Sequence, residues 1–140
     1  MRPDRIIVGE VRGGDAFDMM QCLNTGHDGS MSTGHANSSE DMLSRLENMI
    51  LMGMDIPLTA IRQQIASGID IIIHLGRLRD GSRKVLEIVE VLGYEADEIA
   101  LKPLYQFAET GTDEEGRVCG NLQKKGELSY VEKLQYAGLW

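Results

Sequence analysis

The chain has 140 residues, of which 42% are hydrophobic and 26% charged, and its formal net charge is −8. This balance is typical of a folded chain with one core or part of one, and it excludes a disordered polar segment. The acidic balance argues against nucleic acid as a partner, because binding to a phosphate backbone needs Lys and Arg gathered on one face.

No apolar run approaches the roughly 20 residues that a membrane-spanning helix needs. The first ten residues, MRPDRIIVGE, lack the apolar stretch of a signal peptide. We therefore expect a cytoplasmic chain. Cys22 and Cys119 are too few and too far apart in the sequence for a disulfide framework, so we expect buried, reduced thiols.

The first elements read as strand, helix and strand. Residues 5–9, RIIVG, form the β-branched apolar run of a strand that is buried on both faces, and Glu10 follows at once. Apolar residues recur at helical spacing over 16–23, and a short strand over 30–33 ends near His35. The connection is long enough for a parallel crossover. The side chains of Glu10 and His35 should therefore emerge at the same carboxyl edge of one sheet.

Two helices are predicted next. Ser38 or Ser39 can cap the first helix, whose apolar stripe runs over 42–50, with methionines that fill the core. Pro57 fits the first turn of the second helix, and Gly68 supplies its stop.

The following residues predict an antiparallel meander. Strands over 69–78 and 84–92 are joined by a turn that contains Asp80-Gly81, and a third strand lies near 99–107. His74 falls within the first of these strands, where we expect a satisfied histidine in the core or on the face of the sheet and not a catalyst. From residue 109 the composition shifts to Gly, Thr, Glu and Lys, which we interpret as a weakly held tail with a short helix near its end.

Glu10 is a candidate site residue. A carboxylate directly after a buried strand is costly, because an unpaired charge loses its hydration there. The carboxyl ends of parallel strands are also where α/β proteins bind ligands. The alternative is an ordinary strand-ending acid beside a turn.

The second candidate site is a stretch rich in His, Gly and hydroxyl residues, over 25–30 and 32–38. Its histidines and hydroxyls supply hydrogen-bond donors, and its glycines let the backbone come close to a ligand. Both features suit the binding of phosphate oxygens or a metal-bound water. The alternative is a polar loop that caps the next helix. Zinc is not expected, because Cys22, His27 and His35 match no familiar zinc spacing and lack a fourth ligand.

Taken together, these residues resemble the type II/IV secretion ATPase superfamily, and most closely its Tad (Flp) pilus-assembly, CpaF-like branch. The resemblance covers at least residues 1–108. It is carried by six stretches: 2–14 (RPDRIIVGEVRGG), 24–30 (NTGHDGS), 32–37 (STGHAN), 43–47 (LSRLE), 62–70 (RQQIASGID) and 77–83 (RLRDGSR).

The resemblance implies an α/β fold, namely the C-terminal part of a RecA-like P-loop NTPase domain followed by an antiparallel β meander. Residues 1–108 would belong to this domain and 109–140 would form a C-terminal tail. The implied protein is a homo-hexameric ATPase that hydrolyses ATP with Mg and powers pilus assembly or protein secretion. It would be peripheral at the inner face of the cell membrane, held there by inner-membrane pilus or secretion platform proteins.

The resemblance also implies roles for individual residues. Glu10 corresponds to the Walker B acid, which would hold Mg through water and orient the attacking water. His35 corresponds to the histidine of the family's His box, near the terminal phosphate, and the two would be the catalytic residues. Arg12, His27 and Thr33 would bind the nucleotide.

The phosphate-binding pattern Gly-x-x-x-x-Gly-Lys-Ser/Thr does not occur in the sequence. We therefore expect a truncated gene or a piece of a longer chain that is inactive alone, with unpaired sheet and exposed apolar surface. Arg2 or Arg5 could reach a neighbouring subunit's nucleotide, although a surface or strand-end arginine is the alternative. The alternative function is a non-catalytic remnant or interaction fragment. A DNA-translocating relative conflicts with the acidic balance.

Overall fold

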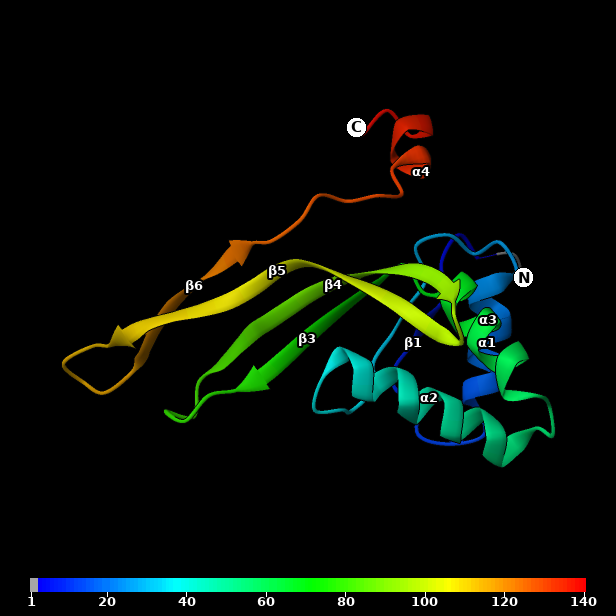
Figure 1. Cartoon of the computed structure of the whole chain (residues 1–140), viewed down its shortest axis with the longest axis horizontal. Coiled ribbons are helices and arrows are strands. Elements are labelled where there is room, and N and C mark those ends of the chain that lie inside the picture. Colours follow the sequence, from blue (N-terminus) through cyan, green and yellow to red (C-terminus); the bar gives the residue numbers. More distant parts are fainter. Residues whose placement is uncertain (1–2) are drawn as a thin grey trace. The chain divides into compact units, whose positions relative to one another are not determined.

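The computed structural model describes residues 3–140. It is an α/β structure with two compact units, one made of residues up to Asp70 together with Gly93–Ala100, the other of Ile71–Leu92 and Leu101–Trp140. The elements in chain order are β1 (Ile7–Val8), α1 (Ala16–Asn24), β2 (Met31–Ser32), α2 (Ser39–Gly53), α3 (Leu58–Gly68), β3 (Ile71–Arg77), β4 (Arg83–Glu95), β5 (Glu98–Thr112), β6 (Val118–Lys124) and α4 (Glu132–Tyr136) (Figure 1).

Helices α1, α2 and α3 pack against one another and form the core of the first unit. The cap of α2 is Ser38, whose hydroxyl accepts a hydrogen bond from the Asp41 N–H at 3.0 Å, as the sequence predicts. Pro57 directly precedes α3, and Gly68 ends it. The apolar stripes meet in a buried set: Ala16, Met19, Met20, Leu43, Leu46, Met49, Ile50, Ile61 and Ile65.

Strands β1 and β2 are parallel, with Ile7 opposite Met31 and Val8 opposite Ser32. Backbone hydrogen bonds extend the pairing at both ends, because the Met31 N–H donates to the Ile6 carbonyl and the Val11 N–H to the Thr33 carbonyl, both at 3.0 Å. With α1 between the strands, the predicted parallel crossover is confirmed.

The expected burial of β1 on both faces is wrong for this chain. The side chain of Ile7 is 62% exposed, Met31 opposite it is also exposed, and Val8 is half-buried. The reason is that β1 and β2 form a two-stranded sheet by themselves within the described residues. A β-branched run predicts a strand, but only neighbouring strands and helices bury it.

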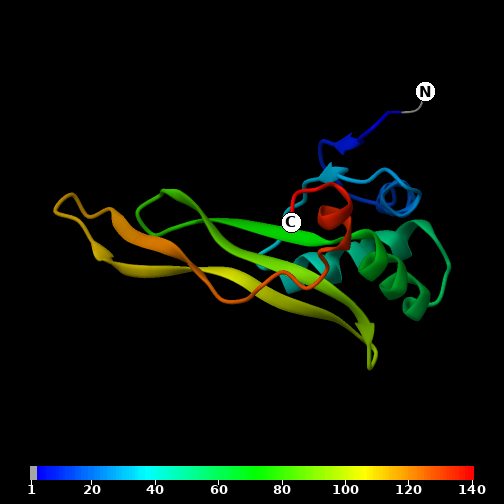
Figure 2. The same ribbon diagram turned by 90° about the horizontal axis from the view of Figure 1, so that it is seen from above.

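The second sheet has the order β3-β4-β5-β6, and its hairpins lie side by side (Figure 2). Strand β3 is antiparallel to β4, and β5 to β6. His74 lies on β3 opposite Glu87 and is mostly covered, which agrees with the expected sheet-face position. The expected tail contains a full strand, β6, that the sequence interpretation missed. Both cysteines are free, but Cys119 on β6 is exposed and Cys22 is only half-buried, so the expected burial is wrong for Cys119 and only partly met by Cys22.

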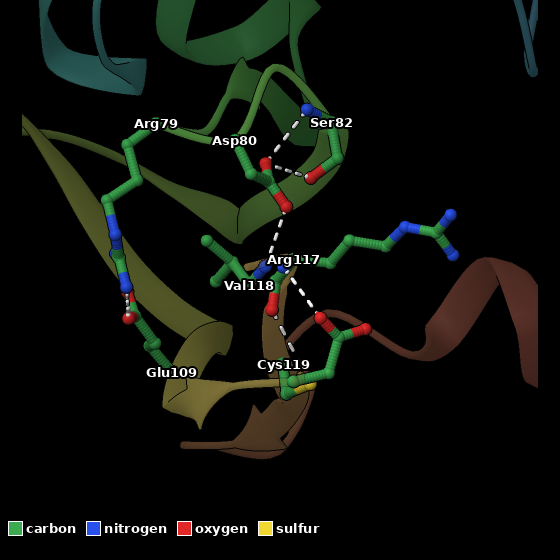
Figure 3. A network of polar contacts seen from close by, with 8 residues as sticks. Arg79, Asp80, Ser82, Glu109, Arg117, Val118 and Cys119 are labelled. Atoms are coloured by element: carbon green, nitrogen blue, oxygen red, sulfur yellow. Dashed lines mark hydrogen bonds and ion pairs between the residues drawn. The ribbon is translucent and has the colours of Figure 1, made fainter. Parts of the chain in front are cut away.

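Asp80 joins the β3–β4 turn to β6 (Figure 3). Its carboxylate accepts hydrogen bonds from the Ser82 N–H at 2.9 Å, the Ser82 hydroxyl at 2.6 Å and the Val118 N–H at 2.6 Å. These donors lower the pKa of Asp80 from 3.8 to about 2, with the Ser82 side chain as the largest cause. Beside it, Arg79 binds both carboxylate oxygens of Glu109.

We expect the stability of this sheet to depend on pH through Asp80. A folded-state pKa of about 2 against an ordinary 3.8 means that the stabilisation is fully present above about pH 4 and is lost as the pH falls to about 2. Asp80→Asn should therefore destabilise the chain at neutral pH, and the difference from the unaltered chain should shrink below pH 4. Unfolding midpoints across this range measure it. Asp55→Asn, at an exposed residue, is the control; equal pH dependence in both variants would contradict the assignment.

Candidate functional site at the carboxyl edge of β1 and β2

The carboxylate of Glu10 pairs with two side chains, those of Arg12 and His35. The Nη2 atom of Arg12 lies 2.5 Å from one carboxylate oxygen of Glu10, and Nε2 of His35 lies 2.9 Å from the other. The Glu10 side chain is 22% exposed, whereas His35 is 83% exposed and Arg12 is similarly open to solvent. The parallel strands thus bring Glu10 and His35 to one edge, as the crossover predicts, and Arg12 joins them.

The charge of Glu10 follows from these contacts. The hydrogen bond from Arg12 is the largest cause of a lowered pKa, partial burial opposes it, and the charges of Arg12 and His35 lower it further. The carboxyl group is therefore ionised at neutral pH. Such a group is suited to holding a cation's water shell and orienting a water molecule, and is poorly suited to donating a proton.

Thr33 lies beside this cluster, where β2 ends. Its hydroxyl donates a hydrogen bond of 2.6 Å to the carbonyl of Gly9, the residue before Glu10. This contact fixes the two strand ends against each other. The hydroxyl proton is committed to the backbone, while the oxygen keeps its capacity to accept a hydrogen bond.

His27 is placed at the opposite end of the strand pair. Its carbonyl accepts a hydrogen bond from the Ser30 hydroxyl at 2.7 Å, and the Ser30 oxygen in turn accepts one from the Ile6 N–H at 2.9 Å. Ile6 precedes β1, whereas Glu10 follows it. The structure therefore does not bring His27 together with Glu10. The Nδ1 atom of His27 is buried and has no hydrogen-bond partner in the described part of the chain.

Arg5 lies at the same end as His27. A Cβ atom on Gly29 would lie 3.0 Å from the Arg5 Nε atom, so the Arg5 side chain lies close against Gly29. Gly29 has a φ of +77°, which glycine adopts without strain. Arg2, the other candidate for reaching a neighbouring subunit, lies outside the described residues.

Close glycine contacts position the loop that carries Arg12. A Cβ atom on Gly53, at the end of α2, would lie 3.2 Å from both Cα and the carbonyl oxygen of Gly14. The Gly13 N–H also donates to the Asp15 carboxylate at 3.0 Å. The approach of Gly53 to Gly14 could not be found in the sequence, because the contact joins distant residues.

The residue types at this edge fit Mg held through water. Mg usually keeps several waters and uses one or two carboxylates together with substrate phosphates. Glu10 supplies one carboxylate, and both of its oxygens are engaged by Arg12 and His35. Among residues 3–140 no group of three or more His, Cys, Asp or Glu side chains is arranged to hold a metal ion. A cage made only of protein ligands is thus not formed by the described residues.

Comparison with known proteins gives a family match over residues 1–137, to the model described as Type II/IV secretion system protein. A protein of Mycobacterium tuberculosis named for conjugal transfer is 41% identical over 88 residues, which are 63% of this chain and 25% of that protein. The conjugal transfer protein TrbB of Rhizobium radiobacter is 37% identical over 94 residues, 67% of this chain and 28% of TrbB.

A solved structure agrees with the sequence matches. The VirB11 ATPase of the Brucella suis type IV secretion system, crystallised with sulphate, matches with a TM-score of 0.60 and 34% sequence identity, over 64% of this chain and 28% of that one. The predicted fold, part of a RecA-like P-loop domain with an antiparallel meander, is confirmed.

The chain spans about a quarter of the length of the curated relatives it matches. Within residues 3–140, no helix is long and apolar enough to cross a membrane. The chain belongs to the type II/IV secretion system protein family.

Proposed function

We propose that this chain is the carboxyl-terminal part of the RecA-like domain of an ATPase that powers secretion or pilus assembly. The observation that carries the proposal is the contact of Glu10 with His35 at 2.9 Å, where two parallel strands end. This is the edge at which open α/β sheets bind nucleotides. The relative that is named an ATPase of a type IV secretion system supports the same activity.

The cofactors of this proposal are ATP and Mg. Bound Mg would neutralise the charge that develops on the phosphates during transfer. Glu10 would hold the water shell of the ion and orient the attacking water, since its lowered pKa keeps it ionised. His35, exposed beside it, would stabilise charge near the terminal phosphate.

Arg12, His27 and Thr33 complete the proposed nucleotide site. The Arg12 guanidinium forms an ion pair with the Glu10 carboxylate. Its side chain is long enough to leave Glu10 and bind a phosphate oxygen instead. Thr33 offers an acceptor at the same edge. His27 is the least supported of the three, because it lies at the other end of the strand pair; its buried and unpaired Nδ1 is the feature that favours a ligand.

We further propose that the complete protein is a homo-hexamer in the cytoplasm, bound to inner-membrane platform proteins, with residues 1–108 in the ATPase domain and 109–140 as its tail. The Tad (Flp) pilus-assembly branch is our first candidate, because the stretches over 2–14, 24–30 and 32–37 together resemble it most closely. Relatives named for conjugal transfer and type IV secretion make those systems the second candidate. Deleting the gene and scoring pilus assembly against conjugation separates the two branches.

We expect the 140-residue chain alone to bind Mg-ATP very weakly. The loop whose N–H groups and lysine would surround the phosphates is not in its sequence, so the remaining groups reach only one side of the nucleotide. Calorimetric titration with Mg-ATP measures this. Glu10→Gln in the same chain is the control for any residual binding at the edge.

Micromolar affinity of the unaltered chain would mean that the phosphate site has been misplaced. Hydrolysis by the complete ATPase distinguishes the proposal from a non-catalytic remnant. A complete chain that has the phosphate-binding loop and still fails to turn over ATP would favour the remnant.

A further inference from the structure

The strongest unexplained feature outside the proposed site is a buried acid. Glu90 lies within the apolar part of β4 and is only 1% exposed. Its carboxylate accepts hydrogen bonds from the Ser129 N–H, at 3.0 and 2.9 Å to its two oxygens, and from the Tyr130 N–H at 2.9 Å. None of the ion pairs in the described part of the chain includes Glu90. Two consecutive backbone N–H groups therefore satisfy the oxygens of this buried side chain.

These donors belong to a strap, residues 125–140, that leaves the sheet after β6 and ends in α4 (Figures 1 and 2). The N–H groups of Lys125 and Gly126 both donate to the Leu104 carbonyl, at 2.7 and 3.3 Å. Pro103, the residue before Leu104, has no N–H, so it cannot donate to a further pair with β6. The strap therefore starts where the pairing of β5 with β6 ends.

Two further hydrogen bonds of the strap lie beside those to Glu90. The Lys102 ammonium donates to the Ser129 hydroxyl at 2.8 Å, and the Tyr130 hydroxyl donates to the Leu92 carbonyl. Both are exposed contacts. Glu90 is the one buried group among these partners, so its contacts with the strap are shielded most from water.

Apolar burial in the strap is only partial. Leu128, Val131 and Leu134 are half-buried, no residue of the strap is fully buried, and α4 has only five residues. The apolar side chains at the end of the strap, Tyr136, Leu139 and Trp140, are exposed. By contrast, the hydrogen bonds from the Ser129 and Tyr130 N–H groups end on a buried side chain, that of Glu90.

We propose that Glu90 is a clamp that holds residues 125–140 on β4 as a detachable arm, which opens and closes as a unit while the sheet stays folded. Ser129 and Tyr130 bind one carboxylate, so neither can leave without weakening the other. Opening leaves the buried carboxyl oxygens of Glu90 without donors until water enters, and this cost favours the closed arm. The clamp is independent of the proposed nucleotide chemistry.

Glu90→Gln in the 140-residue chain tests the clamp. The amide keeps the size of the side chain but places an NH₂ group against the donors, so the arm should open more often. Hydrogen exchange of the Ser129 and Tyr130 amides should become faster by on the order of tenfold or more, while β4 and β5 amides keep their rates. Trp140 is the only tryptophan, so its fluorescence anisotropy should fall. Glu127→Gln, which removes an exposed acid paired with Lys124 in the strap region, is the matched control and should leave both readouts unchanged.

Unchanged exchange at Ser129 and Tyr130 in the folded Glu90→Gln chain would overturn the proposal. Faster exchange of β4 and β5 together with the strap would also overturn it, because Glu90 would then support the whole sheet. If the variant fails to fold, hydrogen exchange of the unaltered chain tests the proposal. The Ser129 and Tyr130 amides should then exchange with one common rate, which is faster than the rate of the β4 amides. Exchange of both amides only with β4 would contradict a separable arm.

Discussion

Replacing Glu10 by glutamine in the complete ATPase should lower the rate of ATP hydrolysis by at least about a hundredfold and keep most of the nucleotide binding. Glutamine preserves the shape of the side chain and can still face Arg12 and His35, which lie at 2.5 and 2.9 Å in the unaltered chain. It lacks the negative charge that would hold the Mg water shell and orient the attacking water. The loss should therefore appear in kcat.

The measurement is kcat for ATP together with the affinity for Mg-ATP. Glu95→Gln makes the same chemical change at the exposed end of β4 and should have near-normal activity. Near-normal turnover in Glu10→Gln would contradict a catalytic role for Glu10 and would leave it a structural residue at the end of a strand. Loss of nucleotide binding and of folding together would point to a structural role as well.

Replacing His35 by alanine in the same ATPase should lower hydrolysis by roughly tenfold or more, as expected when a group that stabilises developing charge is removed. The fold should survive, because the imidazole is 83% exposed and its ion pair with Glu10 is open to solvent. Hydrolysis rate and thermal unfolding midpoint, measured on the same preparation, separate the two effects. A variant that simply unfolds would support the alternative in which His35 only organises the loop before α2.

Local signals in the sequence were sufficient for much of the fold. Ser38 caps α2 because its hydroxyl meets the Asp41 N–H within the same turn, and Gly81 takes a φ of +82° in the turn between β3 and β4. Strand β6 could not be predicted this way. Its Gly, Asn and Lys have low strand propensity, and the strand exists because β5 pairs with it and Asp80 binds the Val118 N–H.

Only part of the candidate site could be predicted from the sequence. Glu10 and His35 could be placed together, because each lies shortly after a strand of one parallel pair. The contact of Arg12 with Glu10 and the approach of Gly53 to Gly14 depend on tertiary structure. Glu90 was missed because an acid within an apolar strand gives no sign of its partners, which lie 39 and 40 residues later.

The central claim is that Glu10 and His35 act as one unit at the edge where β1 and β2 end. Hydrolysis by the Glu10→Gln/His35→Ala double variant of the complete ATPase tests it most directly. Residues that act together are strongly non-additive, so the double variant should be slower than Glu10→Gln alone by less than about twofold. A rate that equals the product of the two single losses would show independent residues and contradict the shared site.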